Sequence, residues 1–293
     1  MRWAIIVCSL FAIVLAAGWV WGYLSGSRGF FPAAQVRQIK NIVTLSQKTS
    51  EGAPAPGQHE SRTRVQCDRF TAPGTAVLLT VGQSNAANDG ETPFAPPGGV
   101  YNFNFEDSEC YVARDPLLGA TGAGGSVWSR LGELLVDRGA YKQVLIVPIA
   151  YGGSSIAAWA DPEALMPRIA QAQDGLAKYG ITITHVLWHQ GESNQRMPGE
   201  IYKLYFREVE NAMRGASIGA PIFVAISSIC GTGGSEELRR AQSELADPAR
   251  NIFHGPDTDK INAPEDRIQM CHFSDSGLKK HAEAWFSVLT AGQ

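Results

Sequence analysis

The stretch Ala76-Val77-Leu78-Leu79-Thr80-Val81-Gly82-Gln83-Ser84-Asn85 runs from a short apolar segment through a glycine into small polar residues. A short apolar run that ends at a glycine is typical of a buried strand, and the residues after it are typical of a sharp turn. The polar side chains of this turn should therefore lie at the carboxyl end of a strand, where ligands bind in open α/β sheets.

Similar apolar runs follow along the chain, each bounded by glycine or polar residues and separated by segments with helical spacing. Strands are predicted at residues 76–81, 143–150, 182–188 and 221–229, with a weaker one at 251–255. Helices are predicted at 128–138, 162–179, 199–214, 236–245 and 276–289. This alternation predicts an α/β fold with a central parallel sheet of about five strands.

The composition is that of a protein with a large apolar core and few extended charged segments. The chain has 293 residues, 44% of them hydrophobic, and a formal net charge of -3. This size suits one substantial α/β domain with additional segments. No long basic block is available to neutralise a phosphate backbone, so we expect no nucleic-acid partner.

The first residues differ in kind from the rest, because no charged residue occurs from Trp3 to Leu24 while Arg2 precedes them. This run is long enough to cross a hydrocarbon core of about 30 Å, and it exceeds the apolar stretch of about 7–15 residues in signal peptides. We expect a transmembrane anchor at residues 1–25, with a signal peptide cleaved after Ala16-Ala17 as the alternative. A juxtamembrane helix and flexible spacer should occupy residues 26–70, and the α/β domain residues 71–293.

Cysteine usage agrees with export of this domain. Cys8 lies in the apolar segment, and the four cysteines beyond it form an even set that suits two disulfides in an oxidising compartment. Sequence leaves three complete connectivities open, and four buried free thiols are the alternative. We expect pairs Cys67–Cys110 and Cys230–Cys271, and a location in the periplasm or outside the cell, membrane-anchored or secreted if the first segment is cleaved.

Residues that can carry chemistry gather after the predicted strands. They form the segments Gly82-Gln83-Ser84-Asn85, Tyr151-Gly152-Gly153-Ser154-Ser155, His189-Gln190-Gly191-Glu192-Ser193-Asn194 and, far downstream, Cys271-His272-Phe273. Each segment alone is ordinary turn or capping chemistry. Together they supply a serine on a sharp turn, glycines that allow close backbone approach, an amide donor and a late histidine, which are the parts needed for acyl transfer.

These four segments resemble the blocks of the sialate O-acetylesterase-like carbohydrate esterases within the SGNH hydrolase superfamily. The resemblance extends from about Ala76 to the C-terminus. It implies a three-layer α/β/α, flavodoxin-like fold and a serine esterase that removes O-acetyl groups from an envelope or extracellular carbohydrate. The reaction would pass through an acetyl-serine intermediate and need neither cofactor nor metal.

The resemblance also implies a role for individual residues. Ser84 would be the nucleophile and His272 the general base. The oxyanion hole would consist of the backbone N–H groups of Ser84 and Gly153 and the side-chain amide of Gln190. Contacts with the substrate are expected from Asn85, Gly152 and Asn194. Trp159 closely follows the Gly152-Gly153 turn, so we expect it to form a wall of the substrate pocket, with packing in the core as the alternative.

The third member of the triad is open, because many relatives carry an aspartate three residues before the histidine and this chain has Gln269 there. We rank Glu192 above Asp266 as the substitute acid. A dyad in which Gln269 orients His272 is a further possibility. Of the other histidines, we expect His185 in the core and His281 on a solvated helix face.

Other functions use parts of the same pattern. A glycan O-acetyltransferase would use identical residues. A glycan-binding pseudoenzyme would keep the pocket but would have lost activity together with the missing aspartate. His189 and Glu192 could suggest a metal hydrolase, but their spacing does not match the HExxH arrangement. We therefore predict no metal site.

Overall fold

The computed structural model describes residues 62–231 and 233–291. The predicted anchor (1–25) and most of the predicted spacer (26–70) lie outside the described residues, so the predicted anchor, spacer and location stay predictions. Among the residues that are described, no helix has both the length and the apolar character needed to cross a membrane.

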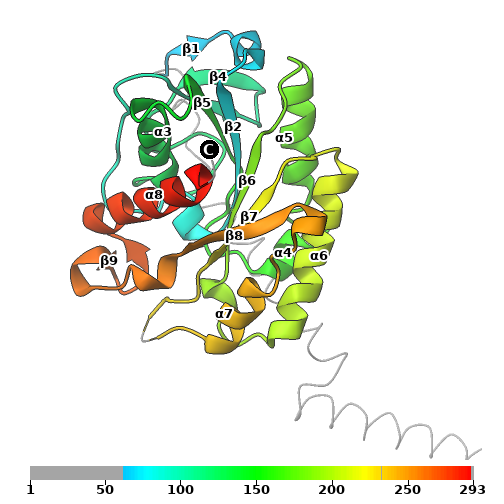
Figure 1. The fold of residues 1–293 in the computed structure, drawn as a ribbon, viewed down its shortest axis with the longest axis vertical. Coiled ribbons are helices and arrows are strands. Elements are labelled where there is room, and N and C mark those ends of the chain that lie inside the picture. Colours follow the sequence, from blue (N-terminus) through cyan, green and yellow to red (C-terminus); the bar gives the residue numbers. More distant parts are fainter. Residues whose placement is uncertain (1–61, 232, 292–293) are drawn as a thin grey trace, which may run out of the picture. The chain divides into compact units, whose positions relative to one another are not determined.

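One eight-stranded sheet forms the centre of the fold (Figure 1), with the strand order β1-β4-β3-β5-β2-β6-β7-β8. Its six parallel strands are β2 (Thr75–Gly82), β3 (Val100–Asn104), β5 (Gln143–Pro148), β6 (His185–His189), β7 (Ile222–Ile226) and β8 (Ile252–Asp257). At one edge, β4 (Glu109–Val112) and β1 (Arg64–Val65) continue the sheet in antiparallel pairing. The predicted α/β class is confirmed.

The predicted number of about five strands is too small, because the edge formed by β3, β4 and β1 was not foreseen. Strand β3 contains buried asparagines, which hide the apolar alternation expected of a strand. The side chain of Asn102 both donates to the carbonyl of Leu118 and accepts from its N–H, at 3.1 and 2.7 Å. The hydrogen-bonding groups of the Asn102 side chain are thus satisfied by the loop that contains Leu118. The periodicity of apolar residues in the sequence does not reveal such a pairing.

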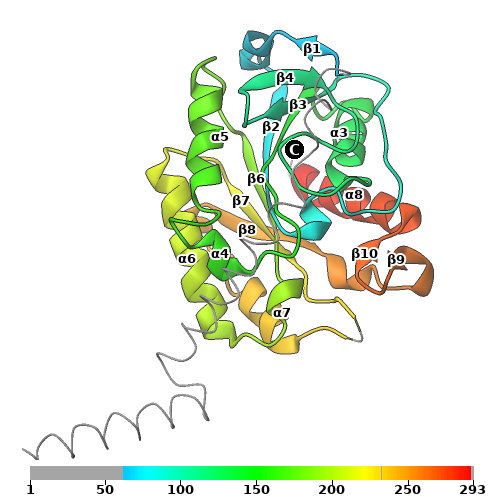
Figure 2. The ribbon, with the colours of Figure 1, turned by 180° about the vertical axis from the view of Figure 1, so that it is seen from behind.

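Helices cover both faces of the sheet, as Figures 1 and 2 show from opposite sides. Helices α3 (Val127–Asp137) and α8 (Asp275–Thr290) cover one face, and α4 (Ile156–Trp159), α5 (Pro167–Ala177), α6 (Gly199–Gly215) and α7 (Glu236–Ser243) cover the other. Strand β2 serves both cores, because successive side chains of a strand point to opposite faces. Leu79 packs in one core and Leu78 in the other.

Both predicted disulfides are confirmed. Cys67, in the 3₁₀ helix η2 (Cys67–Thr71), bonds to Cys110 of β4. The ordered fold therefore includes residues at the end of the predicted spacer. Cys230, after β7, bonds to Cys271, which precedes β10 (His272–Phe273) of a short hairpin with β9 (Arg267–Ile268).

The order β5-β2-β6 has a direct consequence for the site. These three strands are neighbours and parallel, so their carboxyl ends meet at one edge of the sheet. The segments that follow β5, β2 and β6 begin with Ile149, Gln83 and Gln190 respectively. Loops at this edge are where open α/β sheets bind ligands.

We expect removal of the first disulfide to destabilise the fold without affecting the site. Cys67 and Cys110 are 43 residues apart, and a cross-link over such a loop contributes about 2–4 kcal/mol by restricting the unfolded chain. The double variant Cys67→Ser/Cys110→Ser should lower the free energy of unfolding by that amount in urea titrations. If the free energy of unfolding of this variant equals that of the oxidised wild type, the disulfide does not stabilise the fold.

Stability should also fall in acid because of His185. Its ring stacks on Phe223 at 6.0 Å between centroids, and burial lowers the pKa of His185 to about 4. The unfolded chain binds the proton at about pH 6.5, so the free energy of unfolding should decrease by up to about 3 kcal/mol as pH falls from about 6.5 to 4. His185→Gln should flatten this slope in unfolding curves measured across that range.

The matched control is His254→Gln, which removes an exposed histidine from β8. It should leave the slope unchanged. An equal flattening in both variants would contradict the assignment of the slope to His185.

Candidate active site

Ser84 lies on a turn that requires a glycine two positions earlier. It opens the 3₁₀ turn η3 (Ser84–Ala86) directly after β2 and is 7% exposed. Gly82 has φ +145°, and a Cβ added there would lie 1.9 Å from the carbonyl oxygen of His189. The ends of β2 and β6 therefore approach more closely than any larger residue would allow.

Gln83 fastens this turn to the loop after β6. Its side-chain oxygen accepts hydrogen bonds from the N–H groups of Ser193 and Gly191, at 3.0 and 3.3 Å, and from the Gln190 amide at 3.2 Å. The side chain is buried, so these bonds replace water. Gln83 is not among the predicted site residues, although it lies inside the Gly82–Asn85 segment.

Two backbone donors are free at this edge of the sheet. The N–H groups of Ser84 and Gly153 meet no acceptor among the described residues. Gly153 has φ +68°, and a Cβ built on it would meet no atom within 4 Å, so its turn borders open space. The preceding residue, Gly152, is fixed by its N–H bond to Thr121 Oγ1 at 2.6 Å. These donors can stabilise a developing oxyanion.

Gln190 and Asn194 are held within the protein. The amide nitrogen of Gln190 contacts Asn194 Oδ1 at 2.6 Å, and also Gln83 Oε1 and the carbonyl of Ser154, both at 3.2 Å. Asn194 Oδ1 additionally accepts from the N–H of Ile156 at 2.9 Å. Both side chains thus join the loops after β5 and β6. The predicted roles of Gln190 as a third oxyanion donor and of Asn194 as a substrate contact stay predictions.

His272 is brought beside Ser84 through the neighbours of both residues. Asn85 Nδ2 donates to the carbonyl of Cys271 at 3.2 Å, and β10 packs against η3. Arg267 Nη1 donates to the same carbonyl at 2.7 Å. The described residues contain no hydrogen bond between the Ser84 hydroxyl and the His272 ring; such bonds often tighten only when substrate binds.

The predicted acids have other partners. Glu192 Oε1 lies 3.0 Å from His189 Nε2 and accepts from Asn85 Nδ2 at 2.9 Å. Burial acts to raise the pKa of Glu192, but His189 and these hydrogen bonds outweigh it and lower the pKa. Asp266 is paired with Lys280 at 2.7 and 2.8 Å. Within the described chain neither carboxylate bonds to His272, so their roles as triad acids stay predictions.

Gln269 does not orient His272 either. It is exposed, and it forms a tight turn with Met270 between β9 and β10, at φ +52° and +56°. The Cys271 N–H closes this turn on the carbonyl of Ile268 at 3.1 Å. Two successive positive φ values are those of a type I′ hairpin turn, which directs this position away from the sheet.

Two predictions for aromatic residues need correction. Trp159 is fully buried, packs edge-on against Trp188 and donates to Ser154 Oγ at 2.9 Å, so it belongs to the core and not to a pocket wall. His281 is also fully buried instead of solvated, and its Nε2 accepts from the indole of Trp285 at 3.0 Å. Burial, followed by the charges of His189 and Arg267, lowers the pKa of His281 well below its usual value.

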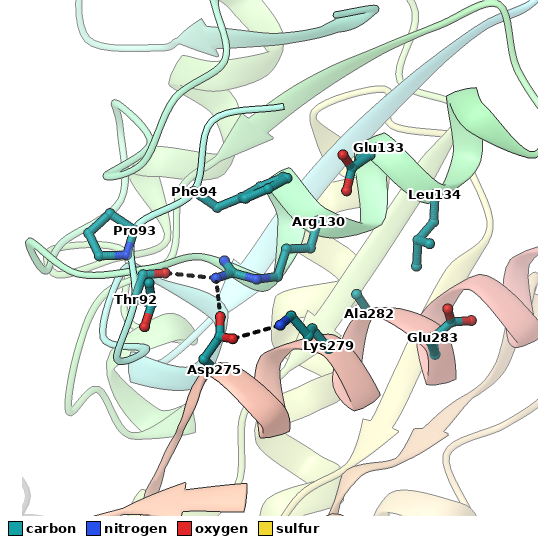
Figure 3. A pocket seen from close by; sticks show the side chains of 10 residues that line it. All are labelled: Thr92, Pro93, Phe94, Arg130, Glu133, Leu134, Asp275, Lys279, Ala282 and Glu283. Atoms are coloured by element: carbon teal, nitrogen blue, oxygen red, sulfur yellow. Dashed lines mark hydrogen bonds and ion pairs between the residues drawn. The ribbon is translucent and has the colours of Figure 1, made fainter. Parts of the chain in front are cut away.

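A pocket of about 290 Å³ lies beside α3 and α8 (Figure 3). Arg130 crosses it, donating to the carbonyl of Thr92 at 2.8 Å and pairing with Asp275 at 3.0 Å. None of the predicted catalytic residues lines this pocket. Elsewhere in residues 62–231 and 233–291, no group of three or more His, Cys, Asp or Glu side chains could hold a metal ion.

One of three similar solved structures, the first described here, supports the fold. A protein from Arabidopsis thaliana is 18% identical, with a TM-score of 0.63 over 75% of this chain and 99% of that chain. A carbohydrate acetylesterase from Xanthomonas citri is 17% identical, covering 74% of this chain and 57% of that chain with a TM-score of 0.48. One from Sinorhizobium meliloti is 14% identical, covering 74% and 99% with a TM-score of 0.45. A search of curated protein sequences finds no significant match.

The family model described as carbohydrate esterase, sialic acid-specific acetylesterase matches residues 74–285. This range spans well over half of the chain and contains all four segments on which the resemblance was based. The predicted family is therefore confirmed. The chain belongs to the sialic acid-specific acetylesterase family of carbohydrate esterases, and it is a carboxylic ester hydrolase.

Proposed function

We propose that this enzyme removes O-acetyl groups from a carbohydrate through an acetyl-serine intermediate on Ser84. One observation carries the proposal: at the joined ends of β5, β2 and β6, Ser84 lies with two uncommitted backbone donors, and Asn85 ties the hairpin of His272 to the same turn. This combination provides a nucleophile, an oxyanion hole and a general base.

The first half of the reaction forms the acetyl-enzyme. Ser84 Oγ attacks the acetyl carbonyl carbon while its proton passes to the His272 ring. The N–H groups of Ser84 and Gly153 donate to the resulting oxyanion. The bond between the carbonyl carbon and the sugar oxygen then breaks, and His272 returns the proton to that oxygen, which leaves as a sugar hydroxyl.

The second half releases acetate. Water gives a proton to His272 and attacks the acetyl carbonyl through the same oxyanion hole. Collapse of this intermediate frees Ser84 Oγ, which recovers a proton from His272. Both halves thus use one base and one set of donors, and no further co-reactant is needed.

The two disulfides support a location outside the cytoplasm for the catalytic domain, because disulfides persist in oxidising compartments. We infer that the domain is tethered by the segment before Leu24, or secreted if that segment is cleaved. Its substrate would then be an acetylated glycan of the cell envelope or the surroundings.

Ser84→Ala and His272→Ala should each reduce kcat/KM by about 10⁴-fold or more, because both remove a group that changes bonds in the reaction. Acetate release from an acetylated glycan panel and from a small acetyl ester measures this loss. Ser287→Ala, on the exposed side of α8, is the control and should keep full activity. Undiminished activity of Ser84→Ala would contradict the proposal, and so would acetyl transfer to added glycan that exceeds acetate release.

Gly153→Ala should lower kcat/KM by about 10–100-fold, because a side chain at φ +68° shifts the N–H that faces the oxyanion. Gly139→Ala is the matched control: Gly139 has φ +73° and equally open surroundings, but it follows the end of α3 that is remote from the site. Both variants should lose about 1 kcal/mol of stability, and only Gly153→Ala should lose activity. Equal activity in the two variants would contradict the proposed role of Gly153 in the oxyanion hole.

A further inference from the structure

The protonated His272 that forms during catalysis needs a nearby negative charge, and the expected carboxylates are engaged elsewhere. Glu192 is bonded to His189 and Asn85. Asp266 is paired with Lys280. Asp275 is paired with Arg130 and Lys279, at 3.0 and 2.8 Å. A carboxylate already bonded to a cation or a donor has less capacity to stabilise a second charge.

Asp89, which is not among the predicted site residues, lies on a segment that connects the two sides of the site. Asn88 N–H donates to the carbonyl of Thr121, the residue whose hydroxyl fixes Gly152. Two residues after Asp89, the N–H of Glu91 donates to the carbonyl of Phe273 at 3.0 Å. Asp89 is therefore placed between the Gly152–Gly153 turn and the strand that carries His272.

Two glycines make room for the carboxylate of Asp89. A Cβ added to Gly152 would lie 3.3 Å from Asp89 Oδ2, and one added to Gly122 would lie 3.1 Å from Asp89 Cγ. Gly122 also has φ +87°, a conformation that favours glycine. The carboxylate thus packs directly against the glycine that adjoins the proposed oxyanion donor.

This carboxylate has no partner of its own. Asp89 Oδ2 is buried, and neither oxygen accepts a hydrogen bond or pairs with a cation in the described part of the chain. Burial raises the pKa of Asp89, and the positive charge of His272 opposes that rise. A carboxylate with a buried oxygen and no partner is costly, so its retention beside the proposed general base calls for a role.

We propose that Asp89, on the segment after the nucleophile, is a positioning residue that stabilises the protonated form of His272. It would take this role because position 269 holds a glutamine and not an aspartate. The inference rests on the proposed function of His272 as general base. Asp89 acts through its charge and not through a direct hydrogen bond to His272.

Other charged groups near His272 do not provide this stabilisation. On β9, Arg267 lies over the Phe273 ring at 4.3 Å and adds a second positive charge. On α8, the charged groups form their own pairs, and His281 packs on Phe273. The turn η3 contains no titratable acid or base. Glu91 uses Oε2 to accept from the N–H of Asp275 at 2.9 Å.

The test is the pH dependence of kcat/KM for a small acetyl ester, measured on the full-length chain with Asp89→Asn. Loss of the negative charge makes His272 easier to deprotonate, so the acidic limb should move to lower pH by about one unit. The maximal kcat should fall by about tenfold, the equivalent of one pKa unit. Asp89→Ser should show the same shift, and thermal unfolding verifies that each variant is folded.

Glu91→Gln is the matched control, since it removes one negative charge two residues away. Its acidic limb should stay in place. The proposal is overturned if the limb of a folded Asp89 variant does not move, if only KM rises, or if Glu192→Gln or Asp266→Asn produces the shift instead. Failure of the proposed function is a distinguishable result, because it would appear as undiminished activity of the single variant Ser84→Ala.

Discussion

The close approach of Gly82 to the carbonyl of His189 is the contact on which the site depends. It joins the carboxyl ends of β2 and β6 at a distance that no Cβ could occupy. The Gln83 N–H donates to the same carbonyl at 3.2 Å, so the chain turns immediately after the strand. This sharp turn presents Ser84 at the sheet edge instead of continuing the strand into solvent.

Buried amides then transmit this arrangement outward. Gln83 binds the loop after β6, while Asn85 reaches both Glu192 and the carbonyl of Cys271. Gln190 and Asn194 connect that loop to the start of α4. Each side chain makes two or more hydrogen bonds at once, which favours one relative placement of the loops over others. The polar residues around Ser84 therefore hold the loops of this edge together.

Much of this fold could be predicted from the sequence because its central strands are uniformly apolar and end in glycine or polar turns. Strands β2, β5, β6 and β7 and helices α3 and α6 lie close to the predicted ranges. The edge strands were missed because Asn102 and its neighbours depend on loop partners far along the chain. The sequence blocks bring Ser84, Gly153 and His272 to one edge of the sheet, and their roles stay predictions. Trp159 belongs to the core, and His281 is buried instead of solvated, because burial depends on which helix face meets the sheet.

The pairing of β9 with β10 illustrates how order at a catalytic residue can originate elsewhere. A hairpin with two residues in each strand is not stable by itself in water. Its conformation is supported by the bond from Cys271 to Cys230 and by hydrogen bonds from Arg267 to the carbonyl groups of residues 229, 258, 261 and 271. The placement of His272 is consequently constrained by a covalent bond that ends at Cys230, in the loop after β7.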